Sequence, residues 1–239
     1  MGEFSVFLRS SIVIFLLAIG ISACFAPPEF PNEPQISFND ISFKKGATQF
    51  DPDSLILTIN FQDGDGDLGL RSQGADTGTP YHDLWFFQNY NDHTRLVTLA
   101  DRNTPEYDTL PPYEFPYLCT NYSISGTDTF YVQPNEFHYN IHVKYFVKKN
   151  GVYNEFDWLT AFDPICGETF NGRFPLLNDI DRSRPLEGKL KYKMKSAGFE
   201  LLFRLDTLKL DVYIIDRALN VSNTISTPDF VLQDILAGG

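Results

Sequence analysis

The sharpest chemical feature of the chain is an acidic turn, Asp63-Gly64-Asp65-Gly66-Asp67-Leu68-Gly69. Three carboxylates at alternate positions can converge on one hard cation, and the glycines leave the backbone free to wrap around it. The turn is not an EF-hand, because Leu68 stands where that loop needs glycine and Gly74 where it needs glutamate. The sequence predicts a Ca²⁺ site at the three aspartates, with a tight acidic turn that binds no metal as the alternative.

A second residue with defined chemistry is Cys24, which follows a nearly apolar run from Ile12 to Ile21. That run is about half as long as a membrane-spanning helix and is typical of an export signal. Ile21-Ser22-Ala23-Cys24 resembles the lipobox of bacterial lipoproteins, which implies cleavage before Cys24 and acylation of its sulfur. We predict a signal peptide over residues 1–23 and a lipidated, proline-rich tether over residues 24–35. The alternative is an ordinary signal peptide with a chance cysteine.

Two further cysteines, Cys119 and Cys166, remain in the exported part of the chain. In an oxidising compartment their natural fate is a disulfide bond. The bond would close a loop of about 47 residues and contribute about 3 to 4 kcal/mol to stability in the chain-entropy model. A catalytic thiol is the competing interpretation, but neither cysteine lies in a recognisable nucleophile motif.

Charge and motifs restrict the classes of function. The formal net charge is −12, and the largest basic clusters along the sequence are Lys44-Lys45 and Lys148-Lys149, so nucleic acids and anionic lipid surfaces are poor partners. The sequence contains no G-x-S-x-G elbow, His-Glu-x-x-His motif, P-loop or Rossmann fingerprint, and we therefore expect no enzyme. Abundant aromatic residues leave a carbohydrate-stacking platform as an alternative to core packing. Its candidates are Trp85, Phe86, Phe87, Tyr90 and Trp158.

The elements around these residues are predicted to be β-strands. Alternating apolar residues and an Asn150-Gly151 turn signal indicate many short strands and no amphipathic helix of three turns. The predicted strands span residues 36–43, 54–62, 84–90, 94–99, 137–148, 152–157, 188–194, 208–215 and 224–232. We expect an all-β fold over residues 36–239, an antiparallel immunoglobulin-like β-sandwich with a large, partly irregular insertion at about residues 100–185.

This fold predicts a fourth ligand for the acidic turn. If residues 54–62 form the second strand and residues 208–215 the penultimate one, the loops that follow them lie at the same end of the sandwich. Asp216 and Asn220 would then approach the turn. Asp216 is the candidate fourth ligand.

Three segments carry a resemblance to a family: residues 63–70, Asn171-Gly172-Arg173-Phe174-Pro175, and Asp216-Arg217-Ala218-Leu219-Asn220-Val221-Ser222-Asn223. Together they resemble a group of Bacteroidota surface lipoproteins, and the last segment is similar to the end of the penultimate strand in bacterial immunoglobulin-like modules. The resemblance implies an outer-membrane location, on the periplasmic or the cell-surface face, and carries no activity.

From these features we expect a non-catalytic outer-membrane lipoprotein. Its Ca²⁺-stiffened sandwich would act as an interaction module, an accessory part of a larger envelope assembly such as one built on an outer-membrane β-barrel. A surface glycan-binding lipoprotein is the alternative, and an extracytoplasmic hydrolase comes third.

Overall fold

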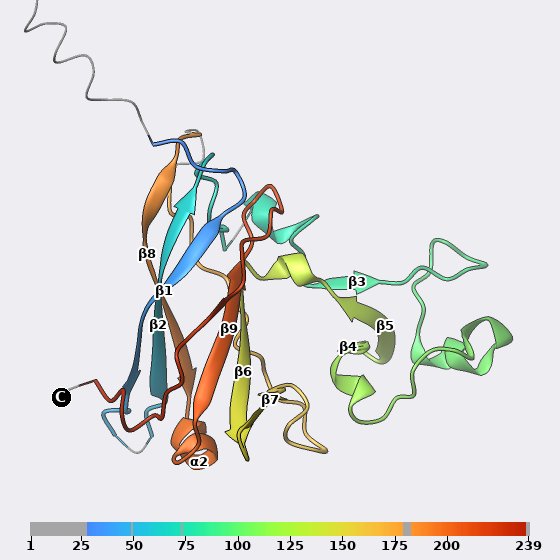
Figure 1. The fold of residues 1–239 in the computed structure, drawn as a ribbon. Helices are drawn as coiled ribbons and strands as arrows, with labels where there is room; N and C mark the ends of the chain where they lie inside the picture. The colour runs from blue at the N-terminus through green and yellow to red at the C-terminus, as the bar shows by residue number, and fades with distance from the viewer. Residues whose placement is uncertain (1–27, 49, 73, 179–182, 238–239) are drawn as a thin grey trace, which may run out of the picture. The chain divides into compact units, whose positions relative to one another are not determined.

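The computed structural model describes residues 28–48, 50–72, 74–178 and 183–237 (Figure 1). The predicted signal peptide and Cys24 lie outside the described residues. The structure below belongs to the unit Pro31–Gly239. Within the described residues, no helix is both long and apolar enough to span a bilayer.

The first sheet has the order β1-β2-β8, with both pairs antiparallel. Its strands are β1 (Gln35–Lys44), β2 (Asp53–Asp63) and β8 (Leu186–Ser196). In β2 every second residue from Leu55 to Phe61 is apolar and buried, as expected when one face of a strand covers a core. Because Asp63 continues this inward series, its carboxylate is fully buried at the end of the core.

The second sheet has the order β10-β9-β6-β7 and is also antiparallel. Its strands are β6 (Ile141–Lys149), β7 (Val152–Phe156), β9 (Leu208–Ile214) and β10 (Ile225–Ser226). The predicted turn joins β6 to β7, with positive φ angles of 52° at Asn150 and 82° at Gly151. This is the backbone conformation that an Asn-Gly hairpin turn needs.

The two sheets confirm the prediction of an all-β, antiparallel sandwich. In immunoglobulin-like domains strands A, B and E share one sheet and strands G, F and C the other, with C′ beside C. Here β1, β2 and β8 occupy the first set of places, and β10, β9, β6 and β7 the second. One buried cluster contains residues of both sheets, including Leu57 of β2 and Leu210 of β9. The short helix α2 (Phe199–Phe203) adds two buried phenylalanines to it.

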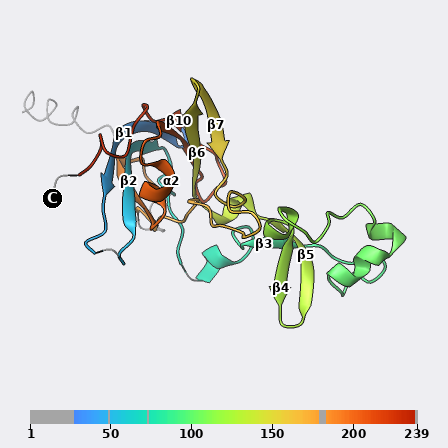
Figure 2. The ribbon, with the colours of Figure 1, turned by 90° about the horizontal axis from the view of Figure 1, so that it is seen from below.

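The irregular segments differ from the predicted insertion at residues 100–185. Because β6 pairs with β9, the hairpin at residues 141–156 belongs to the sandwich. The sandwich is instead interrupted by residues 64–140, here called the insertion, and by residues 157–185, here called the covering segment. The insertion contains a third sheet of order β3-β5-β4, whose β4–β5 hairpin is seen in Figure 2. Its strands are β3 (Leu84–Phe86), β4 (Tyr122–Ser125) and β5 (Asp128–Pro134).

The described part of the insertion also contains five short 3₁₀-helices. They span Gly74–Thr77, Leu99–Asn103, Pro105–Tyr107, Tyr117–Cys119 and Glu136–His138. The last of these replaces the start of the strand that was predicted from residue 137. The Asn135 side chain accepts a hydrogen bond from the Phe137 amide and thereby caps this turn.

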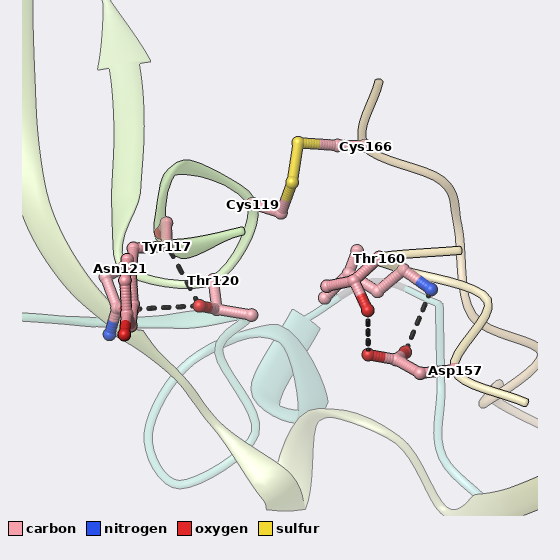
Figure 3. The surroundings of a disulfide bond; sticks show 8 residues. Tyr117, Cys119, Thr120, Asn121, Asp157, Thr160 and Cys166 are labelled. Atoms are coloured by element: carbon pink, nitrogen blue, oxygen red, sulfur yellow. Dashed lines mark hydrogen bonds between the residues drawn. A yellow bond between two sulfur atoms is a disulfide. The ribbon is translucent and has the colours of Figure 1, made fainter. Parts of the chain in front are cut away.

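A disulfide bond joins the insertion to the covering segment (Figure 3). As predicted, it links Cys119 to Cys166, whose Cα atoms are 5.5 Å apart. On one side of the bond Thr120 donates to Asn121 Oδ1, and on the other the Leu159 amide donates to Asp157. The disulfide thus connects two irregular stretches, each ordered by local hydrogen bonds.

Candidate metal centre

The acidic turn, residues 63–69, follows β2 directly and is folded by its glycines. Gly66 and Gly69 adopt φ angles of 71° and 102°, a region that residues with a side chain rarely adopt. A Cβ atom on Gly66 would lie 2.1 Å from the Arg184 carbonyl oxygen, and one on Gly69 would lie 2.3 Å from that of Pro175. The turn closes on itself through the Asp67 amide, which donates to Asp63 Oδ2 at 3.0 Å. The positive φ angles and the close backbone contacts together require glycine at positions 66 and 69.

Asp216 reaches the same place from the other sheet, since it follows β9 and is buried. Both of its carboxylate oxygens accept hydrogen bonds from Asn220, at 2.7 Å from the backbone amide and 2.8 Å from the side chain. Leu219, with a φ of 70°, turns the backbone so that Asn220 can fold back. The Asp216 carboxylate is consequently held in one orientation.

Four carboxylates meet at this end of the sandwich and are called the acidic cluster. Its members are Asp63, Asp65, Asp67 and Asp216. Each offers an oxygen atom, and these atoms all lie within 4.8 Å of one another. Asp63 and Asp216 are buried, and the other two are half-buried. The juxtaposition of Asp216 with the acidic turn is the one that the strand order predicts.

Three oxygens of the acidic cluster are buried without a hydrogen-bond partner within the described structure. They are the Oδ1 atoms of Asp63, Asp65 and Asp67. A buried carboxylate oxygen with no donor carries a desolvation cost that native proteins rarely leave uncompensated. Because the three carboxylates also belong to the cluster whose oxygens lie within 4.8 Å of one another, a cation bound there would offset this cost.

The pKa values of three members of the acidic cluster also show that their charged form is unfavourable. Burial, and after it the charges of Asp65, Asp67 and Asp216, raise the pKa of Asp63 to about 7. Burial and the charges of Asp216 and Asp65 raise the pKa of Asp67 to about 6, although Arg217 opposes this shift. Burial also raises the pKa of Asp216. Each shift means that the negative form is disfavoured, and a bound metal ion would reverse this preference. The acidic cluster can hold a metal ion.

Residues that supply no ligand fix the geometry of this end. Arg173 is foremost, because its guanidinium donates to four backbone carbonyls, of which Arg71 and Asp76 lie 3.0 and 2.6 Å away. The other two are those of Tyr81 and His138, so one side chain ties the covering segment to both ends of the insertion. At the sequence level residues 171–175 are only part of a family resemblance and Arg173 has no assigned role, because a sequence pattern cannot show that the partners of a side chain are backbone atoms.

Asn140 is a second such residue and was missed at the sequence level. It is buried at the start of β6, donates to the Phe174 carbonyl at 2.9 Å and accepts from the Phe174 amide at 2.8 Å. The covering segment in turn accepts from Leu70 through Phe174 and donates to Leu68 through Leu177. A single asparagine between apolar residues carries no signal for this role, which exists only once the segments have met.

The aromatic platform considered above is not assembled. Trp158 is buried in the core and packs edge-on against Tyr145 and Phe170. Trp85, Phe86, Phe87 and Tyr90 are exposed in the insertion, with Phe86 and Phe87 packed against Phe130 and Tyr131. The five residues therefore do not form one surface.

No protein-family model, curated protein sequence or solved structure matches this chain.

Proposed function

We propose that the protein is a lipoprotein of the outer membrane, anchored through Cys24, whose sandwich binds Ca²⁺ at the acidic cluster and serves as a non-catalytic interaction module. The observation that carries the proposal is the set of three unpartnered, buried carboxylate oxygens in the acidic cluster. Such a set is costly in a protein with no ion and is stabilising in one that binds it.

Calcium is the ion that this donor set suits best. All four side chains are carboxylates, which hard cations prefer over the nitrogen and sulfur ligands of zinc or copper. Oxygens on opposite sides of a Ca²⁺ ion lie about 4.6 to 5.2 Å apart, so that oxygens within 4.8 Å of one another can share one ion. Magnesium is smaller and usually keeps several waters, which four crowded carboxylates would displace.

The position of the site explains what the ion would stiffen. The Gly64 amide, inside the acidic turn, donates to the Pro31 carbonyl at 2.8 Å, four residues before β1 begins. At the start of β1, Asn223 exchanges two hydrogen bonds with the backbone of Ile36, at 2.8 and 2.9 Å. Ordering of the turn by Ca²⁺ would therefore also order the place where the proposed tether enters the sandwich. A module held at the membrane would keep a defined orientation towards its partners.

The lipid anchor gives the first prediction. Mass spectrometry of the native N-terminal peptide should show Cys24 as the first residue, carrying acyl chains, because two or more chains are needed for durable membrane attachment. A Cys24→Ala variant should be released into the soluble fraction without modification. An unmodified cysteine in the wild-type protein, or an Ala variant that stays with the membrane after a high-salt wash, would refute the anchor.

The accessory role gives the second prediction. We expect the protein, when purified from its native membrane in millimolar Ca²⁺, to bring down a defined envelope partner, such as an outer-membrane β-barrel, in fixed stoichiometry. Chelation, and separately Asp65→Asn, should reduce this recovery, since both remove the ion that orders the tether junction. Asp234→Asn is the matched control, because Asp234 is exposed and outside the acidic cluster. Recovery of the same partner irrespective of calcium would separate partner binding from the metal, and recovery of none would overturn the accessory role.

A further inference from the structure

The outer face of the first sheet carries a row of four lysines on β8, here called the lysine row. Its members are Lys189, Lys191, Lys193 and Lys195. All four are exposed, whereas Leu190 and Met194 between them point into the core. Alternate residues of a strand are about 6.8 Å apart, so the row is about 20 Å long. Lys44 of β1 extends the positive charge across the sheet, since it lies opposite Ser54, which in turn lies opposite Lys195.

The lysine row is uncompensated within the described structure, because no hydrogen bond or ion pair joins its ammonium groups to another residue there. The second sheet shows the opposite arrangement. Each of its lysines forms an ion pair with a carboxylate: Lys144 with Glu155, Lys148 with Asp229, Lys149 with Asp206, and Lys209 with Asp211. The chain has 31 acidic and 19 basic residues, so carboxylates are abundant. The same face carries two exposed carboxylates, Glu187 on β8 and Asp40 on β1, but neither forms an ion pair with the lysine row within the described structure, so positive charge predominates there.

Hydrogen-bonding side chains accompany the lysine row on the same face. Across β2 and β1, Lys189 is in register with Asn60 and Ser37, Lys191 with Thr58 and Asp40, and Lys193 with Ile56 and Ser42. At the Lys189 end there is a cavity of about 520 Å³. Its polar lining consists of Gln35, Ser37, Asn60, Gln62, Glu187 and Lys189. The face thus combines a line of cations with amide and hydroxyl groups.

We propose that this face binds an anionic polysaccharide, whose acidic groups pair with the lysine row while its hydroxyls bond to the neighbouring amides and hydroxyls. An extended polymer matches a straight row about 20 Å long better than a single small anion does. Amide and hydroxyl side chains recognise sugar hydroxyls in the way that they satisfy other polar groups.

The same face suits other polyanions less well. Single-stranded nucleic acids are held by stacking of bases on aromatic side chains, and the residues in register with the lysine row on β2 are Asn60, Thr58, Ile56 and Ser54. Peripheral binding to a bilayer combines basic residues with large apolar side chains that enter the lipid, and Ile56, which is half-buried, is the one large apolar residue in that register. An anionic glycan needs neither feature.

This inference is independent of the metal, because Asp63 points into the core whereas the lysine row points outward. The overall charge of −12 repels polyanions at long range, but charges further away than about 8 Å are screened at physiological ionic strength. Binding at the lysine row would be a short-range contact that weakens as salt is added.

The test titrates the purified protein with dextran sulfate and with uncharged dextran, which share one backbone. The variant Lys189→Gln/Lys191→Gln/Lys193→Gln/Lys195→Gln removes the lysine row. The matched control, Lys144→Gln/Lys148→Gln/Lys149→Gln/Lys209→Gln, removes the same charge from the paired lysines of the second sheet. Circular dichroism and melting establish that each variant is folded, and Lys191→Gln/Lys193→Gln replaces the fourfold variant if it is not.

We expect the wild type to bind dextran sulfate, in a salt-dependent manner, and not dextran. Loss of the lysine row should weaken binding about tenfold or more, equivalent to about 1.4 kcal/mol, whereas the control should change it less than about threefold. Equal losses in the two variants would show a general charge effect and overturn the proposal. The proposal would also be overturned if the wild type did not bind dextran sulfate, or if it bound polythymidylate or phosphatidylglycerol vesicles as tightly as dextran sulfate.

Discussion

Millimolar Ca²⁺ should raise the melting temperature of the protein by about 5 to 10 °C above its value in chelator. An ion that binds only the folded state stabilises it by RT ln(1 + [L]/Kd), about 2.7 kcal/mol at 100 times the Kd, and 1 kcal/mol shifts the melting temperature of a domain of this size by about 2 to 4 °C. The gain arises because the ion satisfies the unpartnered oxygens of the acidic cluster and cancels their repulsion. Differential scanning calorimetry in Ca²⁺ and in chelator measures the two melting temperatures directly.

The variant Asp63→Asn should have opposite effects on stability in chelator and in Ca²⁺. It keeps a carbonyl oxygen for the Asp67 amide but removes one of four crowded charges. In chelator it should therefore be as stable as the wild type or more so, and in Ca²⁺ it should be less stable. Asp234→Asn, whose carboxylate is exposed, should change neither value. If Asp63→Asn is destabilising to the same degree in both conditions, Asp63 stabilises the fold and does not bind a metal ion.

The pH dependence of the chelator-treated protein provides a control with a defined sign. The pKa of Asp63 is raised, chiefly by burial, from 3.8 to about 7, so that between these values the folded state holds a proton that the unfolded chain has released. Stability in chelator should therefore fall as the pH rises through this window. Calcium binds the deprotonated form, so its stabilising effect should be small near pH 5 and complete above about pH 7.5.

Loss of the disulfide should lower the free energy of unfolding by about 3 to 4 kcal/mol, because the bond closes a loop with a sequence separation of 47 residues. The double variant Cys119→Ser/Cys166→Ser, compared with the wild type in urea titrations, measures this loss. Cys24→Ala removes a cysteine that is not in the bond and should leave the stability unchanged.

Hydrogen exchange should locate that loss. Cys119 belongs to the insertion and Cys166 to the covering segment, and neither lies in a strand of the two sandwich sheets. We therefore expect faster exchange in these two irregular stretches and little change in β2 or β9. Unchanged stability in the double variant, or a peptide map of the native protein in which the two cysteines are not linked, would contradict the assignment.

The core of the sandwich and the acidic cluster were predictable from sequence, the core from a local pattern and the cluster from the strand order of a known type of fold. Alternating apolar residues identify β2 and β9, and the order of strands in an immunoglobulin-like sandwich then places Asp216 beside the acidic turn. Asn150-Gly151 predicts its own turn, since the two positive φ angles are a property of those residue types.

The insertion was not predictable in the same way. Strands β4 and β5 pair across a turn at Gly126, but they are short and directly follow a stretch at residues 105–117 whose interleaved prolines and tyrosines indicate a loop. The side chains of Asn140 and Arg173 bond to backbone atoms, and no side-chain pattern reports such partners. The lysine row is not a run of contiguous basic residues, but the alternation of the strand predicted at residues 188–194 does place Lys189, Lys191 and Lys193 on one face.

Calorimetric titration of the chelator-stripped protein with Ca²⁺ tests the central claim most directly. The account predicts one Ca²⁺ ion bound per chain, much weaker binding of Mg²⁺, and loss of the Ca²⁺ signal in Asp63→Asn but not in Asp234→Asn. Absence of a binding signal in the wild type, or full binding by Asp63→Asn, would contradict it.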